Sequence, residues 1–224
     1  MSLSAAARMN ATPDAVGFVL AGGESRRMGR DKALVEFAGR PLIAHALSIL
    51  EGAGLPAAIA GARSALGAFA PVIEDRESGL GPLSGISAAL ESTQARRAIF
   101  LSVDQPLLPS SLLQCLLRHA RITGRAVTVA SVTGFAQTFP AVLDCAVLPV
   151  LRSELGGGRR GCFRAFEAAA ARLEQPLSIV AVELIAQAGQ AEHPQGINAA
   201  SWLLNVNSPG DLARAAELSA SDIA

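Results

Sequence analysis

Short runs of β-branched and other apolar residues alternate along the chain with longer amphipathic stretches rich in alanine and leucine. The short runs indicate strands, and the longer stretches indicate helices. This alternation is typical of a mostly parallel sheet covered by helices. The predicted strands are 16–20, 57–60, 72–74, 98–103, 127–131, 139–143 and 178–182.

The expected fold class is therefore α/β, in a single Rossmann-like domain of three layers. The length of 224 residues, half of them hydrophobic, suits one domain with a substantial core. We expect this domain to span residues 15–218. A flexible N-terminal tail at 1–14 and a C-terminal tail at 219–224 would flank it.

Proline and serine mark several expected helix starts. Pro41, Pro82 and Pro109 each precede an amphipathic stretch, and the first turn of a helix tolerates the missing N–H of proline. Ser208 is expected to cap the last helix. Polar residues, proline and glycine cluster at 189–200, which predicts a long surface loop.

The charge balance and the cysteines limit the classes of partner and compartment. Lysine plus arginine and aspartate plus glutamate both number 19, so no global positive field attracts nucleic acid or an anionic membrane surface. No apolar run reaches membrane-spanning length, and the N-terminal stretch lacks the hydrophobic region of a signal peptide. We expect a cytoplasmic protein with reduced cysteines and with no nucleic-acid or membrane partner.

The first predicted strand leads directly into a glycine-rich segment, Leu20 to Lys32, which also holds four cationic side chains and two acids. Ligands bind at this end of the strands in open α/β sheets. Gly22 and Gly23 would let backbone amides approach phosphate oxygens closely. The spacing fits neither GxxxxGK[ST] nor GxGxxG. An ordinary strand-to-helix turn with solvated arginines is the alternative interpretation.

One count favours phosphate binding. Of the 19 cationic residues, 18 are arginine, and Lys32 is the only lysine. A compact, strongly hydrated ammonium on a flexible stem is suited to act as a point charge for phosphate. The segment is therefore a candidate site for a nucleoside triphosphate.

Two aspartates follow predicted strands. Asp104 directly follows the run at 98–103 and faces the same rim of the sheet as the glycine-rich segment. A carboxylate there can hold Mg²⁺ together with water and phosphate oxygens. Asp75 can accept hydrogen bonds from a guanine base or from ribose hydroxyls. A turn or helix cap is the structural alternative for Asp104, and stabilisation by a helix dipole is the alternative for Asp75.

The segment Leu20-Ala-Gly-Gly-Glu-Ser-Arg-Arg-Met-Gly-Arg-Asp-Lys32 resembles the LAGGxSxRMGxDK signature of the molybdenum cofactor guanylyltransferases, the MobA family. Four further segments agree with that family in the same order, so the resemblance extends from residue 16 to residue 218. They are Glu74-Asp75, Gly81-Pro-Leu-Ser-Gly85, Val103-Asp-Gln-Pro106 and Asn205-Val-Asn-Ser-Pro-Gly-Asp-Leu212.

The resemblance implies a fold like that of the nucleotide-diphospho-sugar transferases, and the transfer of GMP from GTP to molybdenum-bound molybdopterin with release of pyrophosphate. It implies catalytic roles for Arg27, Lys32 and Asp104, with Asp104 as the ligand of Mg²⁺. The implied nucleotide-binding residues are Leu20, Ala21, Gly22, Gly23, Arg26, Lys32, Asp75 and Asp104.

The resemblance also places Asn205 and Asn207 on the pterin side of the cleft, with turn chemistry as the alternative for both. The substrates would be GTP and molybdopterin. Proteins that deliver molybdopterin and the receiving molybdoenzymes would be transient partners.

Two departures from the family pattern bear on base specificity. Ala60-Gly-Ala-Arg63 stands where members often carry an asparagine, and Gln105 stands where threonine or methionine is commoner. An Asp-Gln-Pro triplet is familiar in the related molybdopterin cytidylyltransferases, whereas Gly23 and Asn207 favour the guanylyl signature. A sugar-phosphate or polyol-phosphate nucleotidyltransferase and a non-catalytic nucleotide-binding or cofactor-chaperone module remain as alternatives.

Overall fold

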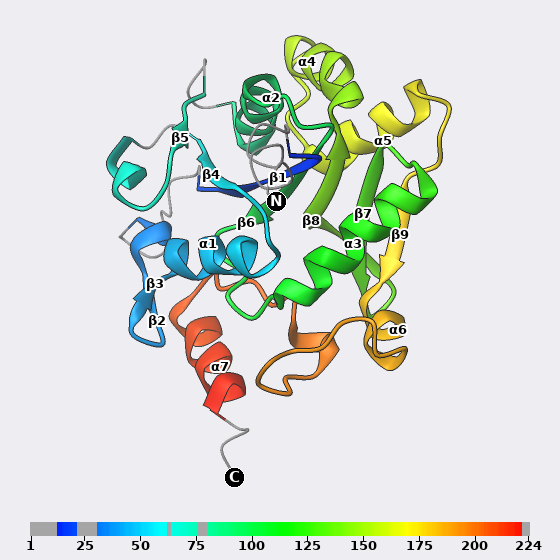
Figure 1. Cartoon of the computed structure of the whole chain (residues 1–224). Helices are drawn as coiled ribbons and strands as arrows, with labels where there is room; N and C mark the ends of the chain where they lie inside the picture. Colours follow the sequence, from blue (N-terminus) through cyan, green and yellow to red (C-terminus); the bar gives the residue numbers. More distant parts are fainter. Residues whose placement is uncertain (1–12, 22–30, 62–63, 76–79, 221–224) are drawn as a thin grey trace, which may run out of the picture.

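A seven-stranded sheet forms the centre of the protein in a computed structural model that describes residues 13–21, 31–61, 64–75 and 80–220 (Figure 1). The strand order is β5-β4-β1-β6-β8-β7-β9. These strands are β1 (Ala15–Leu20), β4 (Ala57–Ala60), β5 (Val72–Ile73), β6 (Arg97–Ser102), β7 (Val127–Val132), β8 (Phe135–Asp144) and β9 (Ser178–Ala181). A separate hairpin pairs β2 (Glu36–Phe37) with β3 (Arg40–Pro41).

All seven predicted strands are confirmed, and so is the mostly parallel sheet. β1 pairs in parallel with both β4 and β6, which brings Gly17 opposite Ala57 on one side and Ile99 on the other. Only β8 among the described strands of this sheet runs antiparallel to its neighbours, β6 and β7. β8 begins earlier than predicted because Thr133 and Gly134, with φ values of 50° and 81°, turn the chain into a tight hairpin with β7.

Helices cover both faces of the sheet, which gives the three layers that the sequence predicts (Figure 1). One face carries α1 (Leu42–Gly52), α3 (Ser110–Thr123) and α6 (Val182–Gln187). The other carries α2 (Pro82–Ser92), α4 (Leu148–Gly156) and α5 (Cys162–Arg172). The short 3₁₀ helices are η2 (Lys32–Leu34), η3 (Ser64–Ala68), η4 (Cys145–Val147) and η5 (Ala199–Ser201).

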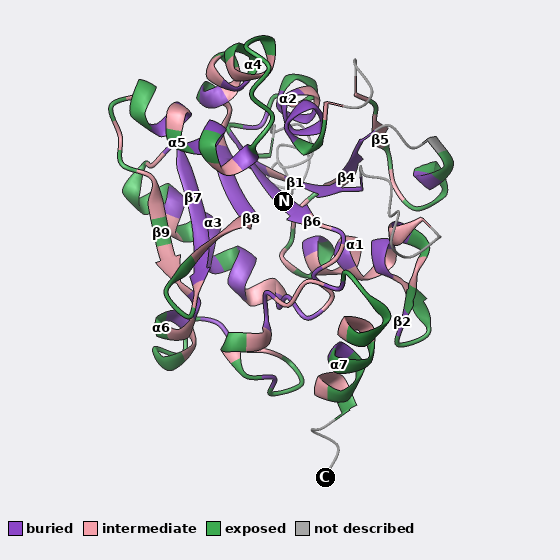
Figure 2. Cartoon of the chain, turned by 180° about the vertical axis from the view of Figure 1, so that it is seen from behind, coloured by how far each residue is buried: buried purple, intermediate pink, exposed green. Residues whose placement is uncertain are grey.

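Two apolar cores lie between the sheet and its helices, and most sheet residues are buried (Figure 2). Phe18 and Phe100 stack in one core with ring centroids 5.4 Å apart. On the opposite face, Gly17 allows α1 to pack closely, because a Cβ there would lie 2.5 Å from a methyl group of Leu50. These contacts fix β1 and β6, whose carboxyl ends carry the predicted site.

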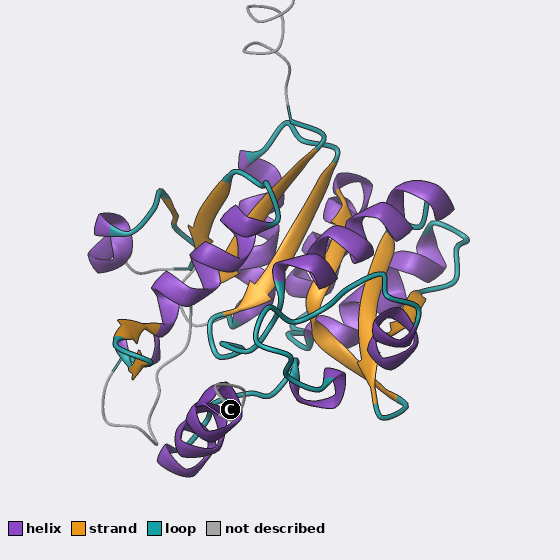
Figure 3. Cartoon of the chain, turned by 60° about the horizontal axis from the view of Figure 1, so that its bottom comes forward, coloured by secondary structure: helices purple, strands orange, loops and turns teal. Residues whose placement is uncertain are grey.

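The C-terminal helix α7 (Pro209–Ala220) and the β2–β3 hairpin lie outside the three layers (Figure 3). The predicted cap of α7 is confirmed, since the backbone N–H of Asp211 donates to Ser208 Oγ at 3.2 Å. The long loop before α7 is also confirmed as far as Asn198, although Ile197 is buried and anchors it.

The three proline predictions need one correction. Pro82 is the first residue of α2, as expected, but Pro41 and Pro109 stand one position earlier, as the residues preceding α1 and α3. Their fixed φ suits this extended position, with ψ near 145° at Pro41 and 141° at Pro109.

The cysteines are free thiols, with Cys115 and Cys162 buried and Cys145 half-buried. Burial raises the pKa of the Cys162 thiol to about 11. Along the described part of the chain, no helix has the length and apolar character needed to cross a bilayer.

Candidate nucleotide site

The carboxyl ends of three parallel strands and the segment before α7 are joined by backbone hydrogen bonds. Ala21 N donates to Ala60 O at 3.2 Å, and Val103 N donates to Leu20 O at 3.3 Å. Val206 N donates to Asp104 O at 2.8 Å. The ends of β1, β4 and β6 therefore form one continuous edge, and residues 205–207 lie beside the end of β6.

The ammonium of Lys32 brings this edge and the C-terminal segment together. Lys32 Nζ lies 2.6 Å from Asp104 Oδ2 and 2.6 Å from Asn207 Oδ1. The side chains of Lys32 and Asp104 are 18% and 13% exposed, so water screens this pair less than a surface ion pair. Charge-assisted hydrogen bonds of this length are among the stronger ones in proteins.

The position of Lys32 is fixed locally by the residue before it. Asp31 Oδ1 accepts a hydrogen bond from Ala33 N at 3.1 Å and so caps η2, and the buried Ala33 anchors the same turn. Asp31 was not among the predicted site residues. The preference of aspartate for N-cap positions was the available signal.

The Asn205–Asn207 segment is held from both sides. Upstream, Trp202 is buried and its indole N–H donates to Ile197 O at 2.7 Å, while Val206 is fully buried. Downstream, Asp211 Oδ2 accepts from Asn207 N at 3.0 Å and from Ser208 Oγ at 2.8 Å.

Within this arrangement, Asn205 is half-buried and Asn207 is exposed. The hydrogen bond from Ser208, then that from the Asn207 backbone, lowers the pKa of the Asp211 carboxyl, and the nearby Lys32 charge contributes in the same direction. Asp211 was not a predicted site residue. Only the three-dimensional turn shows that it supports Asn207.

Asp75 lies at the end of β5 and is in a different electrostatic state. Its Oδ1 is enclosed and has no hydrogen-bond partner among the described residues. Burial raises the pKa of this carboxyl above its usual value of 3.8. Gly85 of α2 packs against it, since a Cβ at residue 85 would lie 3.1 Å from Asp75 Oδ1.

Asp104 has one carboxylate oxygen that suits a metal ion. Oδ2 is engaged by Lys32, whereas Oδ1 is buried without a hydrogen-bond partner in the described structure. The described residues include no group of three or more His, Cys, Asp or Glu side chains placed to bind a metal. A single carboxylate fits Mg²⁺ bound mainly through substrate phosphates and water, which is the usual arrangement in nucleotide enzymes.

Residues 17–198 match the protein family described as the MobA-like NTP transferase domain. The match covers more than half of the chain and includes Lys32, Asp75 and Asp104. The chain belongs to this family.

Individual MobA-like relatives agree. The molybdenum cofactor guanylyltransferase of Pseudomonas putida is 35% identical over 162 residues, covering 70% of this chain and 84% of that protein. The protein of the same name from Rhodobacter capsulatus is 41% identical over 121 residues, covering 49% of this chain and 63% of its own length.

Solved structures show the same fold. Molybdopterin-guanine dinucleotide biosynthesis protein A from Archaeoglobus fulgidus aligns with a TM-score of 0.72 at 21% identity, covering 92% of this chain and 98% of that one. The 2-C-methyl-D-erythritol 4-phosphate cytidylyltransferase of Thermus thermophilus aligns with a TM-score of 0.64 at 15% identity, covering 91% and 98%. The nucleotide-diphospho-sugar transferase-like fold expected from the sequence is confirmed.

Several of the predicted residues of the MobA-like site fall outside the described part of the chain. They are Gly22, Gly23, Arg26 and Arg27. Leu20 and Ala21 are described and buried, and their backbone groups hold β1 to β6 and β4. The structure therefore brings together Lys32, Asp104 and Asn207, with Asp75 at the end of another strand of the same parallel group.

One of the two departures from the MobA pattern, Gln105, has a structural explanation. Gln105 is 4% exposed, and its side-chain amide donates to Phe139 O at 3.1 Å, so it links the end of β6 to β8. Ala60 is buried and its carbonyl accepts from Ala21 N. Ala62 and Arg63 lie outside the described residues.

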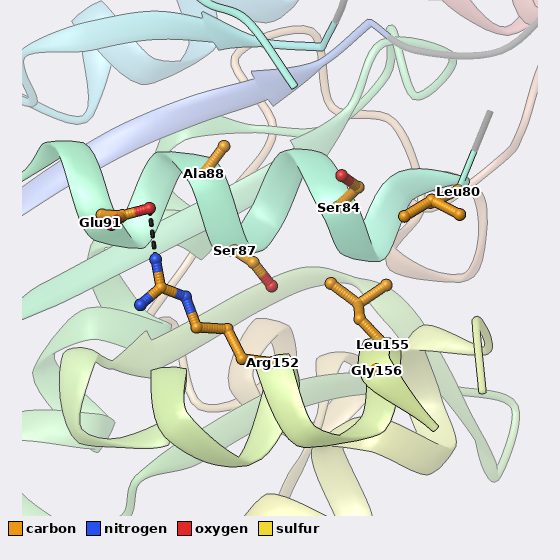
Figure 4. A pocket seen from close by; sticks show the side chains of 8 residues that line it. All are labelled: Leu80, Ser84, Ser87, Ala88, Glu91, Arg152, Leu155 and Gly156. Carbon is orange, nitrogen blue, oxygen red and sulfur yellow. Dashed lines mark ion pairs between the residues drawn. The ribbon is translucent and has the colours of Figure 1, made fainter. Parts of the chain in front are cut away.

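A cavity of about 390 Å³ lies between α2 and α4 (Figure 4). Its lining does not include Lys32, Asp104 or Asn207. An ion pair between Glu91 and Arg152 spans the two helices there, and Ser87 points into the space between them. The Ser87 hydroxyl donates to Leu83 O at 2.9 Å. Among the predicted site residues that the structure describes, none lines this cavity, although Ser84 of the 81–85 segment does.

Proposed function

We propose that the chain transfers GMP from GTP to the terminal phosphate of molybdenum-bound molybdopterin, forming the guanine dinucleotide cofactor and pyrophosphate. Membership of the MobA-like NTP transferase family and the names of the relatives from P. putida and R. capsulatus support this reaction. The observation that carries it is the meeting of Lys32, Asp104 and Asn207 at one ammonium group.

In this reaction an oxygen of the molybdopterin phosphate forms a bond to the α-phosphorus of GTP. The bond from that phosphorus to the bridging oxygen of the β-phosphate breaks, and pyrophosphate leaves with the electron pair. The attacking phosphate is already anionic, so no strong general base is needed. Positioning and charge compensation are expected to dominate the catalysis.

The residues of the chain supply that compensation. Two hydrogen bonds account for two of the three N–H donors of Lys32, and the remaining donor suits a phosphate oxygen. In the proposal, Arg27 and Arg26 add positive charge, and Gly22 and Gly23 offer backbone amides. Asp75, with its unpartnered oxygen, suits the donor groups of the guanine base or the ribose.

We also propose Mg²⁺ as the metal, with Oδ1 of Asp104 as its protein ligand. The buried and unpartnered state of that oxygen supports the assignment. When bound, the ion withdraws charge from the leaving pyrophosphate. Asp104 would hold it and Lys32 would keep the second carboxylate oxygen occupied.

The free thiols suit a reducing cytoplasm, where the proposal places the reaction. The proposal also retains transient contact with proteins that deliver molybdopterin and with the receiving molybdoenzymes.

A second candidate is transfer of CMP, which the Asp-Gln-Pro triplet favours. The buried side chain of Gln105 weakens that interpretation, because its amide donates to Phe139 O. Pyrophosphate release measured with GTP, CTP and ATP in separate assays, each with molybdopterin and Mg²⁺, distinguishes the candidates.

At low nucleotide concentration, we expect pyrophosphate to be released with GTP but not with CTP or ATP. Preferential release with CTP would replace the guanylyl assignment. Sugar phosphates offered in place of molybdopterin test the remaining enzyme class, and nucleotide binding without any release would indicate a non-catalytic module.

A further inference from the structure

Asn207 contacts the nucleotide side of the site, although the family resemblance assigns it to the pterin side. Its side-chain oxygen lies 2.6 Å from Lys32 Nζ, across 175 positions of sequence. An ammonium group only donates hydrogen bonds, so the Asn207 amide must present its oxygen to Lys32. The same ammonium contacts Asp104 at 2.6 Å.

The backbone of Asn207 is fixed independently of its side chain. Its N–H donates to Asp211 Oδ2, and Ser208 Oγ donates to the same carboxylate oxygen. The next residue but one, Pro209, begins α7. The Asn207 amide therefore extends from an anchored turn, so it can restrain the group that it contacts.

Lys32 needs such a restraint, because a lysine side chain has four rotatable methylene groups and loses considerable entropy when held in one position. With Asp104 as its sole acceptor, the ammonium would rotate about one contact. Two acceptors on different chain segments define its position and leave one donor in a fixed direction.

We propose that Asn207 is a positioning residue for Lys32 and that it strengthens the binding of the nucleotide before the second substrate arrives. The inference rests on the proposed function in taking GTP as the nucleotide. It differs from a purely pterin-side role in one respect: removal of the Asn207 amide weakens GTP binding even when molybdopterin is absent.

The first experiment needs no nucleotide. Because Lys32 is the only lysine of the chain, its acylation by an N-hydroxysuccinimide ester can be followed by peptide mass spectrometry. Asn207→Ala removes one of its two acceptors, so we expect the acylation rate to rise about two- to tenfold. An unchanged rate would overturn the inferred contact.

Asn198→Ala is the matched control. Asn198 is an exposed asparagine whose side chain accepts from Ala200 N at 2.9 Å and not from Lys32. We expect Lys32 to be acylated at the same rate in this variant as in the chain without a substitution. Asn207 is exposed and its N–H remains in the alanine variant, so the fold should persist, which far-UV circular dichroism would check.

The second experiment measures the dissociation constant of GTP with Mg²⁺ by calorimetry, without molybdopterin. We expect Asn207→Ala to weaken binding about three- to tenfold, and Asn198→Ala to leave it unchanged. In a Lys32→Ala background, the additional change Asn207→Ala should alter binding less than twofold.

The outcomes separate the inference from the function on which it rests. Faster acylation with unchanged GTP affinity in Asn207→Ala would overturn the positioning role and leave the proposed function intact. Failure of the unmodified chain to bind GTP would overturn both.

Discussion

Two aspartates at the same edge of the sheet, Asp104 and Asp75, are in opposite electrostatic situations. Asp104 Oδ2 lies 2.6 Å from the ammonium of Lys32, so a positive charge compensates this carboxylate. Asp75 Oδ1 is enclosed without a hydrogen-bond partner among the described residues, and burial raises the pKa of this carboxyl. Asp104 is paired with a cation, whereas Asp75 Oδ1 receives no hydrogen bond from the described residues.

The difference indicates how the site is divided. In the proposed function, phosphate and metal need a defined array of charges, and the contacts of Lys32 with Asp104 and Asn207 would provide it. A base or ribose brings its own N–H or O–H donors, so the residue that accepts them must keep an unpaired oxygen. The unpaired oxygen of Asp75 costs stability in the free protein, and in the proposed function it would accept a hydrogen bond from the nucleotide.

Lys32→Ala tests the ion pair of Lys32 with Asp104 and should have the largest effect among the variants of Lys32, Asp75, Gly85 and Asp211. The variant removes a phosphate donor and leaves the Asp104 carboxylate without its cation. We expect kcat/KM for pyrophosphate release to fall about 10²–10³-fold. A loss smaller than threefold would show that the lysine is not part of the phosphate site.

Asp75→Asn tests the carboxyl oxygen that has no partner. We expect the variant to bind GTP about tenfold more weakly, because a neutral amide accepts a weaker hydrogen bond from the nucleotide than a carboxylate does. The same variant should be more stable than the unmodified chain at neutral pH. A raised pKa means that the folded state binds its proton more readily, so stability falls as pH rises from 3.8 through the folded-state pKa.

Urea unfolding at several pH values would measure this second effect of Asp75→Asn. The stability advantage of the variant should disappear as the pH is lowered below 3.8. An advantage that persists at low pH would contradict the electrostatic explanation.

Gly85→Ala changes the packing around Asp75 without changing any charge. Its Cβ would lie 3.1 Å from Asp75 Oδ1, so the carboxylate must shift by a few tenths of an ångström. We expect GTP binding to weaken about two- to fivefold, the cost of one distorted hydrogen bond.

The matched control for Gly85→Ala is Gly156→Ala in α4, where an added Cβ meets nothing within 4 Å. That variant should leave GTP binding unchanged. Equal GTP affinity in the two variants would show that the packing of Gly85 against Asp75 does not affect nucleotide binding.

Asp211→Asn should have the smallest effect. It should change how the stability of the turn before α7 depends on pH in the acidic range. Hydrogen bonds to Asp211 lower the pKa of its carboxyl, so its contribution to stability is present above pH 3.8 and is lost as pH falls through the folded-state pKa. The unfolding midpoint of the variant should change less between neutral and acidic pH than that of the unmodified chain. Identical pH dependence in the two proteins would contradict this account.

The sequence predicted the sheet well because each strand is a short apolar run bounded by turn residues. It missed the first part of β8, where Phe135 is exposed and residues 136–138 are only half-buried in a hairpin. Such residues lack the continuous apolar run by which the other strands were found.

The site was predictable only in part. Lys32, Asp75 and Asp104 could be placed because strand ends of a parallel sheet meet at one edge. The contact between Lys32 and Asn207, and the hydrogen bond from Gln105 to Phe139 O, join segments that no local pattern relates. Side-chain contacts over such separations depend on packing, which periodicity does not encode.

The most direct test of the central claim compares Asp104→Ala with Asp144→Ala. Both aspartates lie at or just beyond the carboxyl end of a sheet strand beside a cation, but β8 is antiparallel to β6, so Asp144 lies at the opposite edge with Arg96. Pyrophosphate release from GTP, with molybdopterin and Mg²⁺, would be measured for both folded variants. We expect release to be abolished in Asp104→Ala and retained in Asp144→Ala, whereas activity retained in Asp104→Ala would contradict the assignment of the site.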